Sequence, residues 1–153
     1  MHRTYENEDI TVLWDSDKCR HAAKCVTGCP EVFDFNRKPW IDLKAAENKK
    51  IWETVKQCPS GALEIMYDHG IRVEYDEKGD CIRAFDGERQ VGECDFRDTG
   101  DAFNIYHTEV DPEYGGKKIA RRMVFRALQE AERRKKTVIP SCSYAAKIVG
   151  EKN

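Results

Sequence analysis

The sequence predicts an α+β protein that is built from two small domains. Two observations indicate this class: strand and helix patterns occur in separate blocks along the 153 residues, and charge is divided unevenly between those blocks. Residues 1–67 carry a net charge of −1, residues 68–114 carry −9 and residues 115–153 carry +8. We therefore predict one domain over residues 1–67 and a second over residues 68–153.

The first domain shows one strand pattern and one helix pattern. Residues 9–14 alternate loosely around Ile10, Val12 and Trp14, which predicts a strand. Residues 15–30 are rich in Cys and Gly and are expected to form an irregular loop. Asp42 can cap a helix that runs to about residue 57 and ends before Pro59, with an apolar face of Ala45, Ile51, Trp52 and Val55.

The second domain begins with strand patterns and ends with helix patterns. Turn-forming residues separate four predicted strands, which favours an antiparallel meander: residues 71–75, 81–85, 90–96 and 102–110. A long amphipathic helix is predicted over residues 117–135, from the apolar stripe of Ile119, Ala120, Met123, Val124, Ala127, Leu128 and Ala131. A further strand over residues 137–140 and a short helix over residues 144–149 complete the expected mixed sheet with helices.

The most unusual feature of the composition is the number of cysteines. No apolar run approaches the roughly 18–20 residues that cross a bilayer, and the polar start of the chain lacks a secretory segment. We therefore expect a cytoplasmic protein without membrane contact. Seven cysteines are many for that compartment, where a disulfide framework is disfavoured. Metal binding or thiol chemistry is the natural expectation.

Four cysteines form a pattern in the first domain. Cys19, Cys25 and Cys29-Pro30, with the distant Cys58-Pro59, are spaced like half of a bacterial ferredoxin run in which Ala22 replaces one ligand. Three thiolates suit a 3Fe-4S cluster, or a 4Fe-4S cluster whose fourth iron takes another ligand. Cys29 and His21 are the local candidates for that ligand. A zinc site and a set of buried free thiols are the alternatives.

The motifs around these cysteines also support a resemblance. The segment over residues 5–67 resembles the divergent single-cluster 4Fe-4S domain family, the YjdI-like proteins, in Val12-Leu-Trp-Asp15, Cys19-Arg-His21, Cys25, Pro30-Glu-Val-Phe-Asp34, Pro39-Trp-Ile-Asp42 and Cys58-Pro-Ser-Gly-Ala-Leu63. The resemblance implies a small ferredoxin-like fold with an iron–sulfur cluster, used for electron transfer with a redox partner protein or for redox sensing. Members of this family often lack a cysteine at the position of Cys29.

A glycine turn precedes the long helix of the second domain. Gly115 and Gly116 open the helix, where backbone N–H groups and the helix dipole favour an anion. Four basic side chains strengthen this positive region: Lys117, Lys118, Arg121 and Arg122.

Residues around this turn resemble the short GNAT-like acyltransferase family, the YjdJ-like proteins. The resemblance rests on His107-Thr-Glu-Val-Asp-Pro112, the glycine turn, Ile119-Ala120 and Val138-Ile-Pro-Ser-Cys-Ser-Tyr144. It implies a trimmed GNAT fold that binds acetyl-CoA or CoA, a small-molecule acyl donor. The strand over residues 107–110, including Val110, would pair with the pantetheine arm, and the turn amides would hold the pyrophosphate. The chain departs from the family pattern at Gly115 and Lys118.

Four residues are candidates for acyl-transfer chemistry. Cys142 follows a predicted strand and is either a nucleophile or a packing residue between sheet and helix. His107 and Glu109 are candidate general bases. By the same resemblance, Tyr144 would donate a proton to the departing CoA thiolate. Cys81 and Cys94 lie in predicted strands and are expected to pack.

Three functional hypotheses follow. The first is an iron–sulfur domain fused to an acetyltransferase-like domain that binds acetyl-CoA and transfers acyl groups. The second is a non-catalytic binding or assembly module with a degenerate CoA site, since Lys118 departs from the family pattern. The third uses the basic helix on nucleic acid, but the adjacent block of charge −9 opposes this hypothesis.

Overall fold

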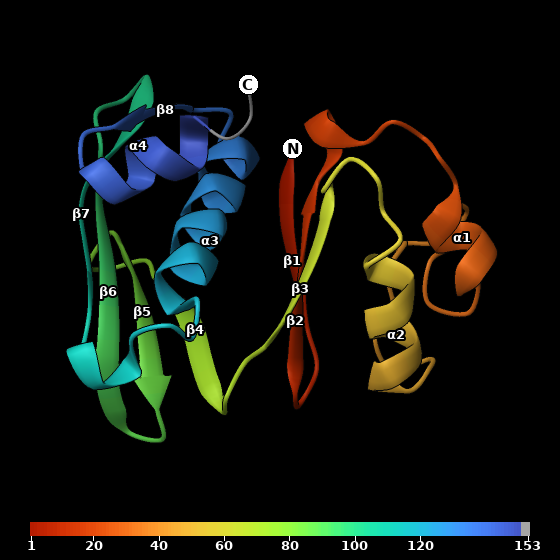
Figure 1. The fold of residues 1–153 in the computed structure, drawn as a ribbon. Coiled ribbons are helices and arrows are strands. Elements are labelled where there is room, and N and C mark those ends of the chain that lie inside the picture. Colours follow the sequence, from red (N-terminus) through yellow and green to blue (C-terminus); the bar gives the residue numbers. More distant parts are fainter. Residues whose placement is uncertain (151–153) are drawn as a thin grey trace.

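The computed structural model describes residues 1–150 and contains two β-sheets (Figure 1). The first sheet is antiparallel and has the order β1 (His2–Glu6), β2 (Ile10–Asp15), β3 (Leu63–Tyr67). The second has the order β4 (Ile71–Asp76), β5 (Cys81–Asp86), β6 (Arg89–Asp98), β7 (Ala102–Val110), β8 (Thr137–Pro140). Its first four strands form an antiparallel meander, and β8 joins parallel to β7. The predicted α+β class, with an antiparallel and a mixed sheet, is confirmed.

Four α-helices surround and separate these sheets. In the N-terminal half, α1 (Lys24–Gly28) and α2 (Asn48–Val55) lie on one side of the first sheet (Figure 1). In the C-terminal half, α3 (Ile119–Arg133) lies between the two sheets, and α4 (Ser143–Gly150) follows β8. Short 3-10 helices occur at Ser16–Lys18 and Pro112–Tyr114. Among residues 1–150, none of the helices combines the length and hydrophobicity that crossing a membrane requires.

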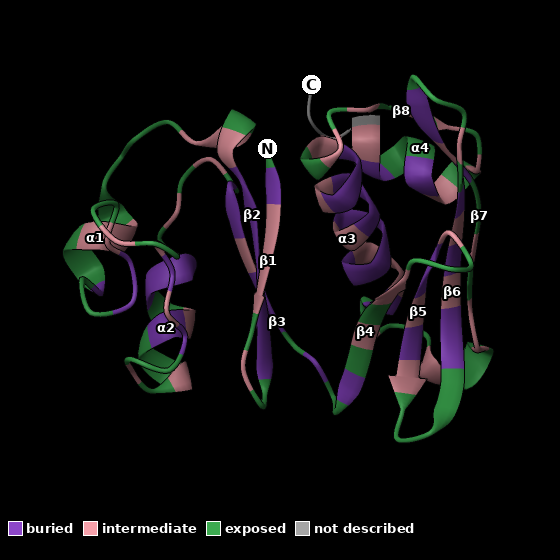
Figure 2. Ribbon diagram, turned by 180° about the vertical axis from the view of Figure 1, so that it is seen from behind, coloured by how far each residue is buried: buried purple, intermediate pink, exposed green. Residues whose placement is uncertain are grey.

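The helix α3 shares one hydrophobic core with both sheets. Its apolar stripe is buried against the second sheet, and Leu13 and Met66 of the first sheet belong to the same core (Figure 2). All six residues of β2 are buried, as expected for a central strand covered on both faces. The other face of the first sheet packs against the cysteine loop and α2 in a second core. The first sheet is therefore common to the two halves.

Two buried polar side chains cross between the halves. Arg122 on α3 is 1% exposed, and its guanidinium donates to the carbonyl oxygens of Ile71 (2.9 Å) and Asp68 (3.4 Å) and to the Glu6 carboxylate of β1 (3.5 Å). The His2 ring lies between two carboxylates, with Nδ1 2.5 Å from Glu132 and Nε2 3.4 Å from Asp15. Each side chain gives a hydrogen-bond partner to polar atoms that would otherwise be buried without one where α3 packs.

Most element predictions are confirmed, and three are wrong or incomplete. The four meander strands, the long helix, β8 and α4 occur close to the expected residues, but β1 and β3 were not predicted. The helix expected to begin at Asp42 begins at Asn48 instead. The Asp42 carboxylate caps only a turn, through the N–H of Lys44 at 3.0 Å, and Ala45 is exposed rather than buried. The loop over residues 15–30 also contains α1 and a 3-10 helix.

Candidate functional site

Three thiols line one small pocket in the N-terminal half. Cys19 directly follows the 3-10 helix, Cys25 lies on α1, and Cys58 lies in the loop after α2. All three side chains are half-buried and pack against the second core. Their neighbours in the pocket include Trp14, Phe35 and Pro59. The structure therefore brings together three of the four predicted metal ligands.

The loop between Cys19 and Cys25 reverses direction through unusual backbone angles. His21 and Ala23 have φ values of 55° and 61°, in the left-handed region that non-glycine residues rarely adopt. The His21 N–H points back and donates to the Cys19 sulfur at 3.4 Å. Both His21 and Ala22 line the pocket. Ala22, which stands where the ferredoxin pattern has a cysteine, therefore still borders the three thiols.

Cys58 occupies the most favourable environment for a thiolate in the pocket. Burial opposes its ionisation, but hydrogen bonds from the N–H groups of Leu63, Ser60 and Ala62 and from the Ser60 hydroxyl hold the pKa of the Cys58 thiol below its ordinary value. Burial raises the pKa of Cys25, and the nearby Cys58 and Cys19 add to this effect. The donor set fits an iron–sulfur cluster: clustered thiols repel one another as anions until a metal neutralises them, and amides stabilise charge on sulfur.

Cys29 lies apart from the other three thiols. It is fully buried in the second core, and its Sγ donates to Glu31 Oε1 at 2.9 Å. Burial and the Glu31 carboxylate raise the pKa of Cys29 to about 11. Lys50 pairs with the same carboxylate at 2.6 Å, which fixes this contact. Cys29 does not line the pocket of the other thiols.

In the C-terminal half, β8 pairs with only the first part of β7, and we call the unpaired edge of β7 with the adjacent start of α4 the wedge. The two strands pair only from Ala102 with Thr137 to Ile105 with Pro140, whereas β7 continues to Val110. The N–H groups of Ser141 and Cys142 both donate to the Ile105 carbonyl, which ends the pairing. Beyond that point the edge of β7 borders no strand of the described chain, and its backbone groups can pair with an extended ligand.

Cys142 lies at the apex of this wedge and at the start of α4. Its sulfur accepts the N–H of Ala145 at 3.3 Å, and its carbonyl accepts the N–H of Ala146 at 3.0 Å. The thiol therefore caps a helix N-terminus, where the dipole favours an anion. The Thr108 hydroxyl lies 3.4 Å from Cys142 Sγ and 3.8 Å from the Cys94 sulfur. Tyr144 follows in the first turn of α4.

The other two candidate catalytic residues lie elsewhere. His107 Nε2 and Glu109 Oε2 are 2.9 Å apart, and both side chains are exposed. Side chains alternate along a strand, so both lie on the face of β7 opposite Thr108 and Cys142. The structure does not bring His107 or Glu109 to the Cys142 thiol. Thr108 was missed by the sequence analysis, although its position between His107 and Glu109 places it on the inner face.

The glycine turn has the backbone of an anion site. Gly116 has φ of +78°, a conformation that favours glycine, and Lys118 at the start of α3 has φ of +60°. No side chain caps α3, so the N–H groups of its first turn point outward without an intrahelical partner. Gly115 and Lys117 complete the turn beside them.

The cations around this turn have unequal environments. Lys118 Nζ and Arg121 Nε both contact the Glu64 carboxylate of β3, at 3.7 Å and 2.8 Å. Arg122 is instead buried against the connection between β3 and β4, where it donates to Asp68 and Ile71, so its guanidinium does not reach the turn surface. Glu64 carried no signal in the sequence, because its role depends on β3 packing beside α3.

Comparisons with known proteins agree with this division. Residues 5–68 match a family model described as divergent 4Fe-4S mono-cluster, and residues 81–153 match one described as GCN5-related N-acetyl-transferase. The N-terminal part is similar to the protein YjdI of Escherichia coli (strain K12), with 35% identity over 66 residues, which is 43% of this chain and 87% of the relative. YjdI of Escherichia coli O157:H7 gives the same values. The chain thus belongs to the divergent single-cluster 4Fe-4S family through its N-terminal half, and its C-terminal half is similar to GCN5-related N-acetyl-transferases.

Proposed function

We propose that the N-terminal domain holds an iron–sulfur cluster through Cys19, Cys25 and Cys58, and that the C-terminal domain binds an acyl-CoA and accepts its acyl group on Cys142. The observation that carries the proposal is the separation of the thiols into two sites. Three line one pocket, while Cys142 caps a helix at the wedge. Each environment suits a different thiol chemistry.

In the first site, the protein supplies three thiolate ligands and a set of amide donors. A bound cluster supplies one-electron transfer or redox sensing, and a redox partner protein would exchange the electron. The N–H groups of residues 60, 62 and 63 stabilise negative charge on the Cys58 sulfur, which raises a reduction potential. We leave Cys29 out of the ligand set because its thiol donates a hydrogen bond to Glu31. The fourth position is left to His21 or to a ligand from outside the chain.

In the second site, the backbone supplies most of the binding. The free edge of β7 from residue 106 to Val110 would pair with the amides of the pantetheine arm. The N–H groups of the Gly116 turn would bind the pyrophosphate at the N-terminus of α3. Lys117 and Lys118 add positive charge at that end.

The proposed acyl transfer needs no reactant other than the protein and the acyl-CoA. The Cys142 thiolate attacks the thioester carbonyl carbon, a new C–S bond forms to Sγ, and the bond from the carbonyl carbon to the CoA sulfur breaks. The proton that leaves the Cys142 thiol ends on the CoA thiolate, which departs as a free thiol. The Ala145 N–H stabilises the attacking sulfur, and Tyr144 is the candidate proton donor to the CoA.

Two measurements on anaerobically purified protein test the proposal. Iron and sulfide counts with electron paramagnetic resonance before and after dithionite should show a cluster, with a signal in the oxidised state for 3Fe-4S and only after reduction for 4Fe-4S. Zinc without iron would refute the first half. Calorimetric titration of the cluster-loaded protein with acetyl-CoA should show binding, and no heat of binding would refute the second half.

One observation favours a second candidate, a non-catalytic module with a degenerate CoA site. Glu64 neutralises Lys118 and Arg121, and Arg122 is buried, so the positive charge available to phosphate is reduced. Under this alternative the protein holds its cluster but forms no acyl-enzyme with acetyl-CoA. Mass spectrometry of the intact protein after incubation with acetyl-CoA distinguishes the two functions.

A further inference from the structure

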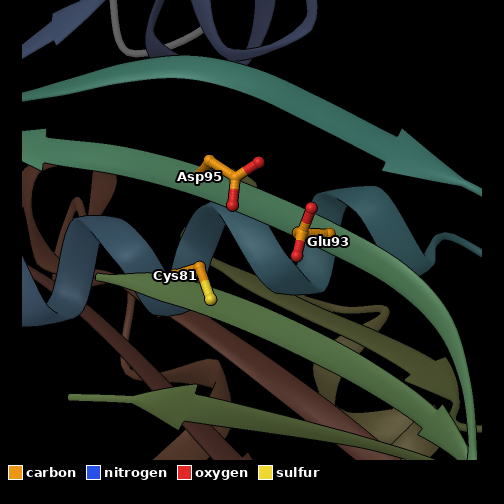
Figure 3. Close-up of side chains that lie close together, drawn as sticks. All are labelled: Cys81, Glu93 and Asp95. Atoms are coloured by element: carbon orange, nitrogen blue, oxygen red, sulfur yellow. The ribbon is translucent and has the colours of Figure 1, made fainter. Parts of the chain in front are cut away.

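A second group of potential metal ligands lies on the outer face of the second sheet. Figure 3 shows Cys81 on β5 and both Glu93 and Asp95 on β6, with their side chains on one face of the sheet. One ligand atom from each lies within 4.8 Å of the other two. The alternate residues Ile82 and Cys94 face the core beneath α3, so this group is separate from the CoA wedge and from the cysteine pocket.

The Cys81 thiol is an independent sign of a ligand at this place. The side chain is only 2% exposed, yet its sulfur makes no hydrogen bond to any residue of the described chain. Cys81 is the direct cross-strand partner of Asp95, which holds the sulfur beside the carboxylates. A Cβ at Gly79 would lie 3.3 Å from this sulfur, so the preceding turn leaves the thiol just enough space.

The two carboxylates are poorly neutralised by the protein. Burial raises the pKa of Asp95, and the charge and hydrogen bond of the adjacent Glu93 raise it further. Arg83 lies beside them, but its guanidinium hydrogen-bonds Asp76, and its Nε is 3.7 Å from Glu93 and buried without a hydrogen-bond partner. His107 is the cross-strand partner of Asp95, but its ring pairs with Glu109 at 2.9 Å. With Cys81 as a thiolate, the three ligands carry −3, and the two nearby basic side chains, Arg83 and His107, are shared with Asp76 and Glu109, so a divalent cation would balance the remaining charge.

We propose that Cys81, Glu93 and Asp95 bind one divalent cation of the zinc class. Zinc accepts both thiolate sulfur and carboxylate oxygen, and three protein ligands leave a fourth position for water. Tetrahedral zinc requires ligand atoms about 3.5 Å apart. The present separations therefore close by about 1 Å through side-chain rotation. A β-bulge between Asp95 and Phe96 marks this place, and bulges commonly re-aim side chains at sites.

The test uses cluster-loaded protein, so that Cys19, Cys25 and Cys58 are already occupied by iron. Calorimetric titration with zinc chloride should give one equivalent, and X-ray absorption at the zinc edge should show one sulfur with oxygen neighbours. Three or four sulfur neighbours would place zinc in the cysteine pocket and overturn the proposal. The absence of zinc binding would overturn it as well.

Three variants sharpen the result. Cys81→Ala should remove the sulfur neighbour and weaken zinc binding by at least about tenfold, and Glu93→Gln, a half-buried and less disruptive change, should weaken it similarly. Glu74→Gln is the matched control. Glu74 is exposed, and it is the cross-strand partner of Arg83, so it lies on the same face of the sheet as the proposed ligands. Unchanged iron content shows that each variant is folded. Equal binding by all three variants, or equal weakening by Glu74→Gln, would contradict the assignment.

Discussion

Cys58 and Cys142 have the same kind of hydrogen-bond donor but different neighbours. Each sulfur accepts backbone N–H groups, from residues 60, 62 and 63 at Cys58 and from Ala145 at Cys142. Their surroundings differ: Cys58 shares a pocket with two further thiols, whereas Cys142 has the Thr108 hydroxyl beside it at the wedge. Under the proposed function, a sulfur that accepts backbone N–H groups would serve as a metal ligand at Cys58 and as a nucleophile at Cys142, according to its neighbours.

The first site should lose its cluster when the Cys58 thiol is removed. Cys58→Ser should lower the iron content by at least about tenfold, because only two protein thiolates remain and the amide-stabilised sulfur is lost. Cys29→Ala is the control, since the Cys29 thiol hydrogen-bonds Glu31 outside the pocket. It should retain iron and lose only about 1–2 kcal/mol of unfolding free energy. Equal iron loss in both variants would place Cys29 among the ligands.

The second site should lose its chemistry but keep its structure in Cys142→Ser. Serine is a good helix N-cap, so the free energy of unfolding should change by less than about 1 kcal/mol. Acyl transfer should fall by at least about 1000-fold, because a neutral hydroxyl replaces the nucleophilic thiol. Intact-mass measurement after incubation with acetyl-CoA checks this loss, and calorimetry should show CoA affinity unchanged. An acyl group found on Cys81 or Cys94 would contradict the role of Cys142.

A buried arginine tests whether the two sites depend on one core. Arg122→Ala should lower the unfolding free energy by about 3 kcal/mol, because the carbonyl groups of Ile71 and Asp68 lose their buried donor. Arg121→Ala is the matched neighbour on α3 and should cost less than about 1 kcal/mol, since its partner Glu64 is half-buried at the surface. Denaturant unfolding followed by cluster absorbance, which reports the N-terminal half, and by far-ultraviolet circular dichroism, which reports the helices and strands of both halves, should give coincident curves. Separate transitions would show independent domains.

The cysteine pocket and the meander were accessible from sequence because their signals are local. Cysteine spacing predicted that Cys19, Cys25 and Cys58 lie together, and the alternation of apolar and polar residues predicted four strands of the second sheet. Cys29 carries the same kind of sequence signal as its neighbours. Only the structure shows that a carboxylate two residues further on accepts its thiol.

The shared core could not be predicted, because it depends on long-range pairing. The strand β1 is polar and has only a weak intrinsic preference for the β conformation, so it forms because it pairs with β2. The residues of β2 are buried on both faces, so they lack the clear alternation of an exposed sheet. For the same reason Arg122 was assigned to phosphate by its place in a basic helix, while packing directs its guanidinium to the buried carbonyl of Ile71 at the start of β4.

The smallest expected effect concerns β3, which touches both sites. In β3, the Leu63 N–H donates to the Cys58 sulfur, and the next residue, Glu64, holds Lys118 and Arg121 at the glycine turn. Glu64→Gln removes the competing carboxylate, and CoA should bind about two- to threefold more tightly, in line with the modest energy of partly exposed ion pairs. Calorimetry at low and physiological salt checks this gain, which should shrink as salt screens the charges. Glu53→Gln, an exposed carboxylate on α2, should leave CoA affinity unchanged. A gain that is equal in both variants would reflect net charge alone, and a loss of affinity in Glu64→Gln would mean that Glu64 positions the two cations for phosphate rather than competing for them.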